Sequence, residues 1–245
     1  MGIYSLITEA KIRKKKLFAL LVDPGKLDEN KLKKFIAGAV KAKVDFFFVG
    51  GSLLTSDSFE NCIRTIKNES SLPAVIFPGN GMQISHKADA ILFLSLISGR
   101  NAEMLIGQHV IAAPYLKVSP LEVISAGYML VESGRPTAVS YMSNTTPIPH
   151  DKDDIAVCTA MAGEMLGLKL IFLDGGSGAL NPVSTKMIAA ISGSIGIPLI
   201  VGGGISTPEK ALENCRAGAD VIVTGNSAEK DPSLVLRLAE AVHSL

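Results

Sequence analysis

Tryptophan is missing from this sequence and aromatic residues as a whole are scarce, which bears on the kind of ligand the protein binds. Only 5% of the 245 residues are aromatic, and the formal net charge is +1. A protein that binds nucleic acid is expected to carry a basic face or aromatic side chains on which bases stack. We therefore expect no nucleic-acid partner.

Cysteine is nearly as scarce. Cys62, Cys158 and Cys215 are odd in number, widely separated and without a CxxC pair. A disulfide framework or a structural zinc site needs paired or closely spaced cysteines, whereas isolated ones suit a reducing compartment. We expect a cytoplasmic protein.

Several catalytic signatures are also absent. The sequence has no GxSxG, HExxH or P-loop motif, so nothing favours a serine hydrolase, a zinc protease or a P-loop nucleotide hydrolase. The four histidines lack the spacing of metal ligands and are expected in the core or at the surface. They are His86, His109, His150 and His243.

Long apolar runs are missing as well. No run reaches the ~18–20 apolar residues of a membrane-spanning helix. The basic residues 11–16 followed by the apolar residues 17–22 resemble the start of a signal peptide. That apolar part is shorter than the ~7–15 residues required, and no small-residue cleavage site follows it. We expect an unprocessed chain without a transmembrane anchor.

What the sequence does contain is a series of eight short apolar runs separated by helical segments. The runs are continuous rather than alternating, as expected for strands that are buried on both faces. They comprise residues 17–22, 45–51, 73–79, 90–96, 137–143, 169–176, 198–204 and 220–226.

The segments between these runs carry helix signals. Thr207 followed by Pro208 is the order of an N-cap and a first-turn proline, and Gly218 closes that segment. The segment before the second run is amphipathic, with one apolar face formed by Leu32, Phe35, Ile36 and Val40. Strand–helix alternation of this kind predicts an α/β protein, a single-domain (β/α)8 TIM barrel over residues 1–245. We expect an irregular segment between strands four and five, at residues 97–136.

Glycine follows the last two runs, at Gly203-Gly204 and at Gly225 before Asn226. In barrels of this type the loops after strands seven and eight often bind phosphate through backbone N–H groups. Residues 175–178 form a third glycine-rich strand end, directly after Asp174, whose carboxylate is placed to accept a proton from a bound hydroxyl. These features predict a phosphate site beside a candidate base.

Two oxygen-bearing residues follow the first two runs. Asp23 comes directly after the first run, and Ser52 comes directly after the second. Because Mg²⁺ typically takes one or two carboxylates together with phosphate oxygens of the substrate, Asp23 facing a phosphate site is a natural ligand, and Ser52 would add a further oxygen. A plain turn at Asp23-Pro24-Gly25 is the alternative interpretation.

The ordered motifs resemble those of one family, geranylgeranylglyceryl phosphate synthase and its bacterial heptaprenylglyceryl phosphate synthase relatives. The similarity runs almost end to end. It rests on DPGK (23–26), VGGS (49–52), FPGN (77–80), NAEMLIGQH (101–109), GYMLVESG (127–134), the segment 151–179, PLIVGGGISTPEKA (198–211) and ADVIVTGNSAE (219–229).

This resemblance implies an enzyme that joins sn-glycerol 1-phosphate to a polyprenyl diphosphate with Mg²⁺, forming an ether and releasing pyrophosphate. It implies Asp23 and Ser52 as metal ligands and Asp174 as the catalytic base. It places the phosphoglycerol site on Phe172, Leu173, Asp174, Gly175, Gly176, Ser177, Gly178, Gly203, Gly204, Gly225 and Asn226.

Two positions depart from the family pattern. The family usually has Tyr-Leu-Glu before its glycine run, whereas this chain has Phe172 and Asp174 at the outer positions. Some bacterial relatives carry a lysine two residues before the metal aspartate, where this chain has Leu21. The glycerol hydroxyl must then be reached by a shorter carboxylate, directly or through water.

Further expectations concern the donor, the prenyl groove and the assembly state. We expect geranylgeranyl diphosphate as donor, a prenyl groove lined from the irregular segment by Met104, Leu105 and Tyr115, a homo-oligomer, and transient membrane contact through the lipid product. Two alternatives stay open: a phosphosugar isomerase or lyase, and a non-catalytic phosphometabolite-binding barrel. The former often uses a lysine near a strand's C-terminal end, and Lys169 lies instead at a strand start.

Overall fold

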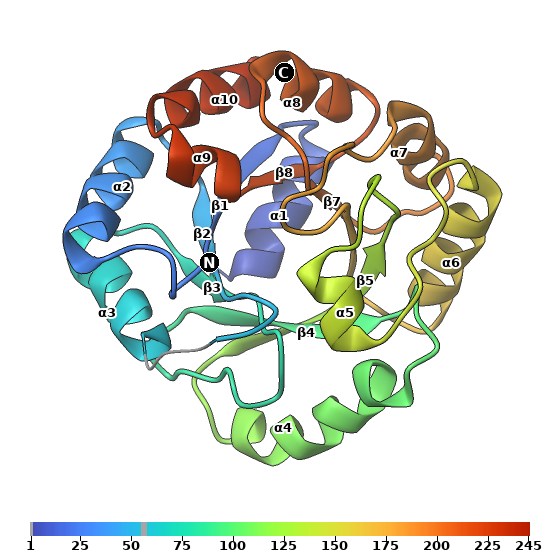
Figure 1. The fold of residues 1–245 in the computed structure, drawn as a ribbon, viewed down its shortest axis with the longest axis horizontal. Helices are drawn as coiled ribbons and strands as arrows, with labels where there is room; N and C mark the ends of the chain where they lie inside the picture. The colour runs from blue at the N-terminus through green and yellow to red at the C-terminus, as the bar shows by residue number, and fades with distance from the viewer. Residues whose placement is uncertain (1, 55–57) are drawn as a thin grey trace.

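Eight parallel strands close into a barrel in the computed structural model, which describes residues 2–54 and 58–245. Each strand pairs with the next in the chain, and β8 pairs with β1 (Figure 1). The strands are β1 (Leu17–Val22), β2 (Phe46–Val49), β3 (Ala74–Ile76), β4 (Ala90–Leu96), β5 (Glu122–Leu130), β6 (Leu170–Asp174), β7 (Leu199–Gly202) and β8 (Val221–Thr224). The expected barrel is confirmed.

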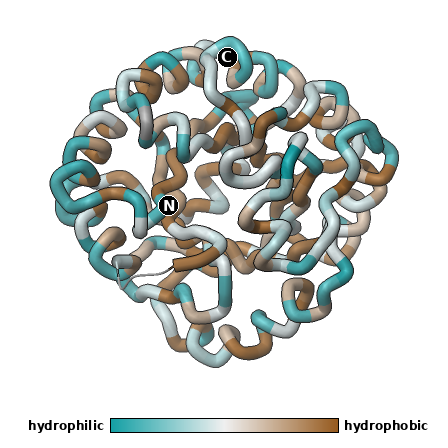
Figure 2. The backbone as a smooth tube through the Cα atoms, in the orientation of Figure 1, coloured by the Kyte–Doolittle hydropathy of each residue, from teal (hydrophilic) through white to brown (hydrophobic). Residues whose placement is uncertain are grey.

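Helices surround the barrel, and hydrophobic residues concentrate on the strands they enclose (Figure 2). The helices are α1 (Ile3–Ile12), α2 (Glu29–Lys41), α3 (Phe59–Glu69), the π-helix η1 (Glu103–Gly107), α4 (Gln108–Lys117), α5 (Ala138–Ser143), α6 (Asp153–Met165), α7 (Thr185–Ser192), α8 (Pro208–Arg216), α9 (Asn226–Lys230) and α10 (Ser233–His243). Within the described ranges, none is both long and apolar enough to cross a membrane.

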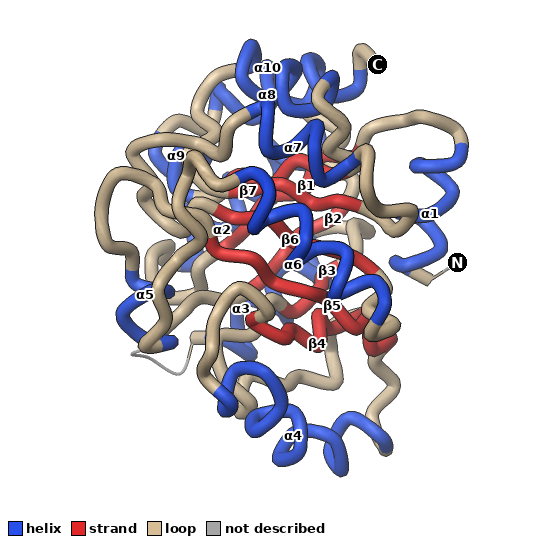
Figure 3. Tube along the Cα trace, turned by 90° about the vertical axis from the view of Figure 1, so that its right-hand side faces the viewer, coloured by secondary structure: helices blue, strands red, loops and turns tan. Residues whose placement is uncertain are grey.

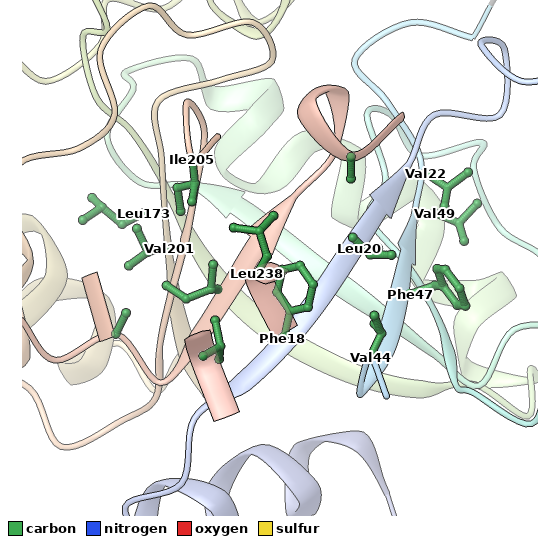
Figure 4. Packing of buried hydrophobic residues seen from close by; sticks show 14 of the residues in the cluster. Phe18, Leu20, Val22, Val44, Phe47, Val49, Leu173, Val201, Ile205 and Leu238 are labelled. Carbon is green, nitrogen blue, oxygen red and sulfur yellow. The ribbon is translucent and has the colours of Figure 1, made fainter. Parts of the chain in front are cut away.

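Alternate side chains of each strand enter two separate hydrophobic clusters. On β1, Phe18 and Leu20 belong to the outer cluster together with Leu238 of α10 (Figure 4), whereas Ala19 belongs to the cluster inside the barrel. The interior also holds aromatic rings, with the centroids of Phe48 and Phe172 5.9 Å apart. Because both faces of the sheet are buried, the strands read as continuous apolar runs.

The two ends of the barrel differ. Helix α1 inserts Ile3 and Ile7 into the interior cluster and closes the end where the strands begin, on the opposite side from α5 (Figure 3). Lys169 lies at this closed end, with its Nζ 5.3 Å from the centre of the Tyr4 ring on α1. The expectation that Lys169 is remote from the strand C-terminal ends is confirmed.

The fifth strand was misplaced by the sequence pattern. Residues 137–143 form α5 and its N-cap, because Thr137 and Ser140 exchange side-chain-to-backbone hydrogen bonds in a capping box. The true strand, β5, lies inside the segment expected to be irregular. Its apolar run is interrupted by Gly127, where a Cβ would lie 2.8 Å from Ile97 and 2.9 Å from Ile171, so this glycine permits close packing of the layers.

Irregularity does occur around β4. The segment between β4 and β5 holds η1 and then α4, which contains Pro114, so the expected departure from a regular helix is confirmed over a shorter range. Between β3 and β4 the described chain has no helix at all. Helices therefore cover the barrel wall less regularly next to β3 and β4 than next to the other strands.

The helix ends and faces predicted from the sequence mostly hold. Thr207 caps α8 by accepting a hydrogen bond from the N–H of Lys210, with Pro208 in the first turn. On α2 the apolar stripe is Leu32, Phe35, Ile36 and Ala39. Val40 was wrongly assigned to that face: its side chain is 45% exposed because it lies at the edge of the stripe.

Candidate active site

Two adjoining cavities open at the C-terminal ends of the strands. The larger has a volume of about 410 Å³ and is mostly apolar, while the smaller, of about 100 Å³, lies among the glycine loops. Both are lined by the same five residues at their junction. These are Leu21, Asp174, Ser177, Gly225 and Asn226. Asp174 therefore faces both cavities.

The smaller cavity is formed by the loops after β6, β7 and β8. Gly203 has a φ of +81°, and a Cβ there would lie 2.5 Å from the backbone N of Gly175 and 2.6 Å from a carboxylate oxygen of Asp174. Among the described residues, no hydrogen bond between loops uses the N–H groups of Ser177, Gly178, Gly203 or Gly204. The cavity thus combines phosphate-like size with uncommitted N–H donors, as an anion site requires.

Asp174 ends β6 and its carboxylate is held from two directions. The hydroxyl of Tyr128 donates to Oδ2 at 2.6 Å, and the N–H of Gly176 donates to Oδ1 at 2.8 Å. Burial raises the pKa of Asp174, while both hydrogen bonds oppose that rise by stabilising the carboxylate. The result is a fixed carboxylate of increased basicity, as a general base needs.

Tyr128 is the functional residue that the sequence reasoning missed. It lies on β5 directly opposite Phe172 on β6, with ring centroids 5.7 Å apart. Burial, the negative charge of Asp174 and the hydrogen bond to it all raise the pKa of Tyr128, so the phenol stays protonated and keeps donating. The adjacent strand thus supplies the phenolic hydroxyl that Phe172 lacks. The motif at 127–134 contained this residue, but correct placement of β5 was needed to recognise it.

The two residues before Asp174 have different surroundings. Phe172 is 1% exposed, belongs to the interior cluster and lines the smaller cavity. Leu173 points the other way and packs with the helices in the outer cluster (Figure 4). Because the Leu173 side chain points away from the cavities, its predicted role in substrate binding can fall only to its backbone atoms.

Asp23 and Ser52 both line the larger cavity, at its β1–β2 side. The Asp23 carboxylate lies against Gly51, where a Cβ would be 3.5 Å from its oxygens. Its Oδ2 forms an ion pair with Lys26 Nζ at 3.1 Å, and its backbone N–H donates to Glu229 Oε1 at 3.2 Å. Burial is the main cause that raises the pKa of Glu229, and the nearby Asp23 charge adds to it.

This donor set fits a hard divalent cation that is shared with a substrate. Carboxylate and hydroxyl oxygens are the ligands that Mg²⁺ takes, and its remaining positions are usually filled by water and phosphate oxygens. Within the described residues no group of three or more His, Cys, Asp or Glu side chains forms a complete protein-only metal site. Asp23 and Ser52 are therefore the residues that would hold such a cation, and Glu229 lines the same cavity next to Asp23.

Beyond the larger cavity lies a narrow apolar one, of about 60 Å³, between β4 and the η1–α4 segment. The two cavities have Pro78, Gly79, Leu94 and Met104 in common, so they adjoin at these residues. Of the expected groove residues, Met104 lines both cavities, but Tyr115 is 63% exposed on α4. Leu105 instead offers its backbone carbonyl to Ser95 Oγ at 2.8 Å.

Two asparagines near the barrel mouth, Asn80 and Asn144, lie outside the junction of the two cavities. Asn80 lines the narrow apolar cavity and accepts a hydrogen bond from the N–H of Met82. Asn144 ends α5 in the left-handed conformation. In contrast, Asn226 Nδ2 donates to Ser177 Oγ at 2.9 Å and joins the loops after β6 and β8.

Comparison with known proteins decides which family this geometry belongs to. A family model described as the PcrB family matches residues 10–242. The chain is 52% identical over 242 residues to the geranylgeranylglyceryl phosphate synthase of Chitinophaga pinensis, covering 99% of this chain and 96% of that one. It is 53% identical over 238 residues to the enzyme of that name from Spirosoma linguale, covering 97% and 96%.

The chain belongs to the PcrB family. Its fold also superimposes on the crystal structure of (S)-3-O-geranylgeranylglyceryl phosphate synthase from Thermoplasma acidophilum in complex with substrate sn-glycerol-1-phosphate. The TM-score is 0.94 with 32% identity, over 100% of both chains. The family resemblance is thereby confirmed, and with it an enzyme of the transferase class.

Proposed function

We propose that this PcrB-family protein is a Mg²⁺-dependent prenyltransferase that joins sn-glycerol 1-phosphate to geranylgeranyl diphosphate. The observation that carries the proposal is the position of Asp174 at the junction of two unlike cavities, one glycine-lined and one apolar. A small phosphorylated acceptor fits the first, and a long apolar donor fits the second. The two substrates then meet at a single carboxylate.

On the acceptor side, the N–H groups of the glycine loops bind the phosphate of glycerol phosphate. The free hydroxyl of the acceptor then extends toward Asp174, which removes its proton as the new bond forms. Fixing this geometry lowers the entropic part of the barrier. The substrate named in the similar Thermoplasma acidophilum structure, sn-glycerol 1-phosphate, supports this choice of acceptor.

On the donor side, Asp23 and Ser52 hold the cation, and Lys26 adds a positive charge at the same edge of the cavity. A bound Mg²⁺ neutralises the negative charge of the departing diphosphate. Lys26 also donates to Asn226 Oδ1 at 2.7 Å, and Asn226 in turn contacts Ser177. The donor edge and the phosphate loop are therefore connected by direct hydrogen bonds.

The reaction conserves atoms in a simple way. The glycerol oxygen forms a bond to the allylic carbon of the donor, and the bond from that carbon to the diphosphate oxygen breaks. The hydroxyl proton passes to Asp174, and pyrophosphate leaves with the bonding electron pair. The product is an ether-linked prenylglyceryl phosphate.

The prenyl tail occupies the larger cavity and continues past Met104 into the narrow one under α4. Leu94 and Met104 line both cavities, and Leu116 on α4 lines the narrow one, so its walls are apolar. A tail that fills both cavities is longer than one confined to the first, which favours a geranylgeranyl donor over shorter ones. Membrane contact through this lipid product follows from its chemistry.

A radiolabel transfer assay tests the proposal. Purified protein receives labelled sn-glycerol 1-phosphate, donors from roughly ten to thirty-five carbons, and either Mg²⁺ or EDTA. Label enters an organic-soluble product only with Mg²⁺, and geranylgeranyl diphosphate gives the highest kcat/KM. Glycerol phosphate binding without transfer to any donor would instead favour the non-catalytic barrel, and transfer unaffected by EDTA would reject the metal role.

A further inference from the structure

The smaller cavity, which is the proposed phosphate site, has a lining whose charge does not complement a phosphate. A phosphate monoester carries close to two negative charges at neutral pH, yet the lining of the smaller cavity includes no Lys or Arg and does include the carboxylate of Asp174. Backbone N–H groups offer only partial charges. A full positive charge close to this cavity would therefore strengthen binding, and the described residues beside it offer a candidate.

Arg135 supplies that charge. Its Nη2 lies 2.6 Å from the position that a Cβ would take on Gly178, so the guanidinium covers the rim of the phosphate loop. Asn226 Nδ2 is 4.0 Å from the same position. Among the described residues, Arg135 takes part in no hydrogen bond or ion pair, so its charge and its donors are uncommitted. The neighbouring acid, Glu132, is paired with His150 at 2.9 Å.

The segment that carries Arg135 is anchored to the phosphate loop on both sides. The carbonyl of Ser133 accepts hydrogen bonds from the N–H groups of Leu180 at 3.2 Å and Asn181 at 3.1 Å. Thr137 contacts the other side, because a Cβ on Gly176 would be 2.8 Å from its hydroxyl. The backbone on both sides of Arg135 is thus held beside the phosphate loop, which keeps its exposed side chain within reach of Gly178.

We propose that Arg135 is a substrate-binding residue whose guanidinium pairs with the phosphate of the acceptor from the rim of the glycine loops. This inference rests on the proposed function, since it deepens the same acceptor site. Guanidinium offers several donors in one plane and suits phosphate geometry, and it remains charged at every working pH. Arg135 would therefore set selectivity for phosphorylated acceptors over neutral polyols.

The test is acceptor binding measured by calorimetry on Arg135→Gln, with Arg135→Lys as the conservative variant. Arg100→Gln is the matched control, because it removes a positive charge from the same end of the barrel, where Arg100 donates to the carbonyl of Gly99. A charge-assisted contact at an exposed site predicts that Arg135→Gln raises the Kd of sn-glycerol 1-phosphate about ten-fold. Arg135→Lys restores part of the affinity, and Arg100→Gln stays within about two-fold of the wild type.

Kinetics separate this role from a structural one. Arg135→Gln should raise the KM for glycerol phosphate and the inhibition constant of inorganic phosphate together, while kcat and the KM for the prenyl donor change less than about two-fold. If the wild type is active and Arg135→Gln binds inorganic phosphate and the acceptor as tightly as the wild type does, the inference about Arg135 is wrong while the proposed function stands. If kcat, both KM values and the inhibition constant all worsened to the same extent and the Tm fell, the inference would also be overturned, because that pattern indicates a structural role. Failure of the wild type to bind glycerol phosphate would overturn the proposed function and this inference with it.

Discussion

The two sides of the barrel mouth expose different parts of the chain to the two cavities. In the loops after β6, β7 and β8, glycine turns expose backbone N–H groups. The direction of these groups depends on φ angles that residues other than glycine rarely adopt, such as +81° at Gly203. Around β4, η1 and α4, apolar side chains such as Leu94 and Met104 form the surface instead. Binding through backbone N–H groups requires glycine turns, which can be seen in the sequence. An apolar groove has the same composition as an ordinary hydrophobic core and cannot be distinguished from one in this way.

Removal of the carboxylate between the two sides should have the largest effect. Asp174→Ala should lower kcat by about 10²–10⁴-fold, the usual contribution of a general base, with an unchanged far-UV circular dichroism spectrum. Asp174→Glu serves as the control, because it keeps the acid and restores the length usual in the family. Wild-type turnover in Asp174→Ala, measured by label transfer, would show that Asp174 is not the base.

A methyl group added to the backbone side should affect acceptor binding next most strongly. Gly203→Ala places a Cβ against Gly175 and Asp174, so we expect an affinity for glycerol phosphate about 100-fold lower or worse, since several hydrogen bonds are displaced together. Gly167→Ala is the matched control: Gly167 has a φ of +83° and open space around it. Gly167→Ala should lose about 1–2 kcal/mol of stability through backbone strain, and Gly203→Ala should lose more, because its Cβ also meets the backbone of Gly175.

Thermal unfolding and calorimetry read out this pair of variants. If Gly167→Ala weakened glycerol phosphate binding as much as Gly203→Ala, general strain rather than occupation of the phosphate cavity would explain the loss. Lost binding in a Gly203→Ala variant that is still folded, with wild-type binding in Gly167→Ala, would assign the effect to the cavity.

A bulky substitution on the apolar side should change donor selection rather than acceptor binding. Met104→Trp blocks the passage between the two apolar cavities, and overpacking of about 1–3 kcal/mol corresponds to a roughly ten-fold higher KM for geranylgeranyl diphosphate. Geranyl diphosphate should be affected much less. Ile106→Trp, at a position 59% exposed on η1, is the control. A uniform effect on all donor lengths would contradict the assignment of the tail to this passage.

The smallest effect should come from the residue that connects β5 to the carboxylate. Tyr128→Phe removes a hydrogen bond that lowers the pKa of Asp174, so that pKa should rise further. Because the base acts as a carboxylate, the acidic limb of the kcat/KM profile should move to higher pH. At neutral pH the rate should fall by about two- to ten-fold, the effect of one hydrogen bond. An unmoved or acid-shifted limb would show that Tyr128 does not tune Asp174.

Much of the fold was predictable because its signals are local. Seven of the eight apolar runs overlap true strands, and the Thr207 cap and the glycine turns sit where expected. The failure at residues 137–143 has a physical cause, since the apolar residues of a six-residue helix resemble a short strand until the capping contacts of Thr137 are seen. The interruption of β5 by Gly127 hid the true strand in the same way.

The sequence by itself determined the barrel, the phosphate loops and the candidate base, because continuous apolar runs, glycine turns and a carboxylate at a strand end each follow from neighbouring residues. The tertiary structure alone decided three further matters. It paired Tyr128 with Asp174 across 46 positions of sequence, placed two apolar cavities side by side at Met104, and laid Arg135 over Gly178. Such contacts depend on which strands become neighbours and how loops cross the mouth, and no local pattern encodes those distances.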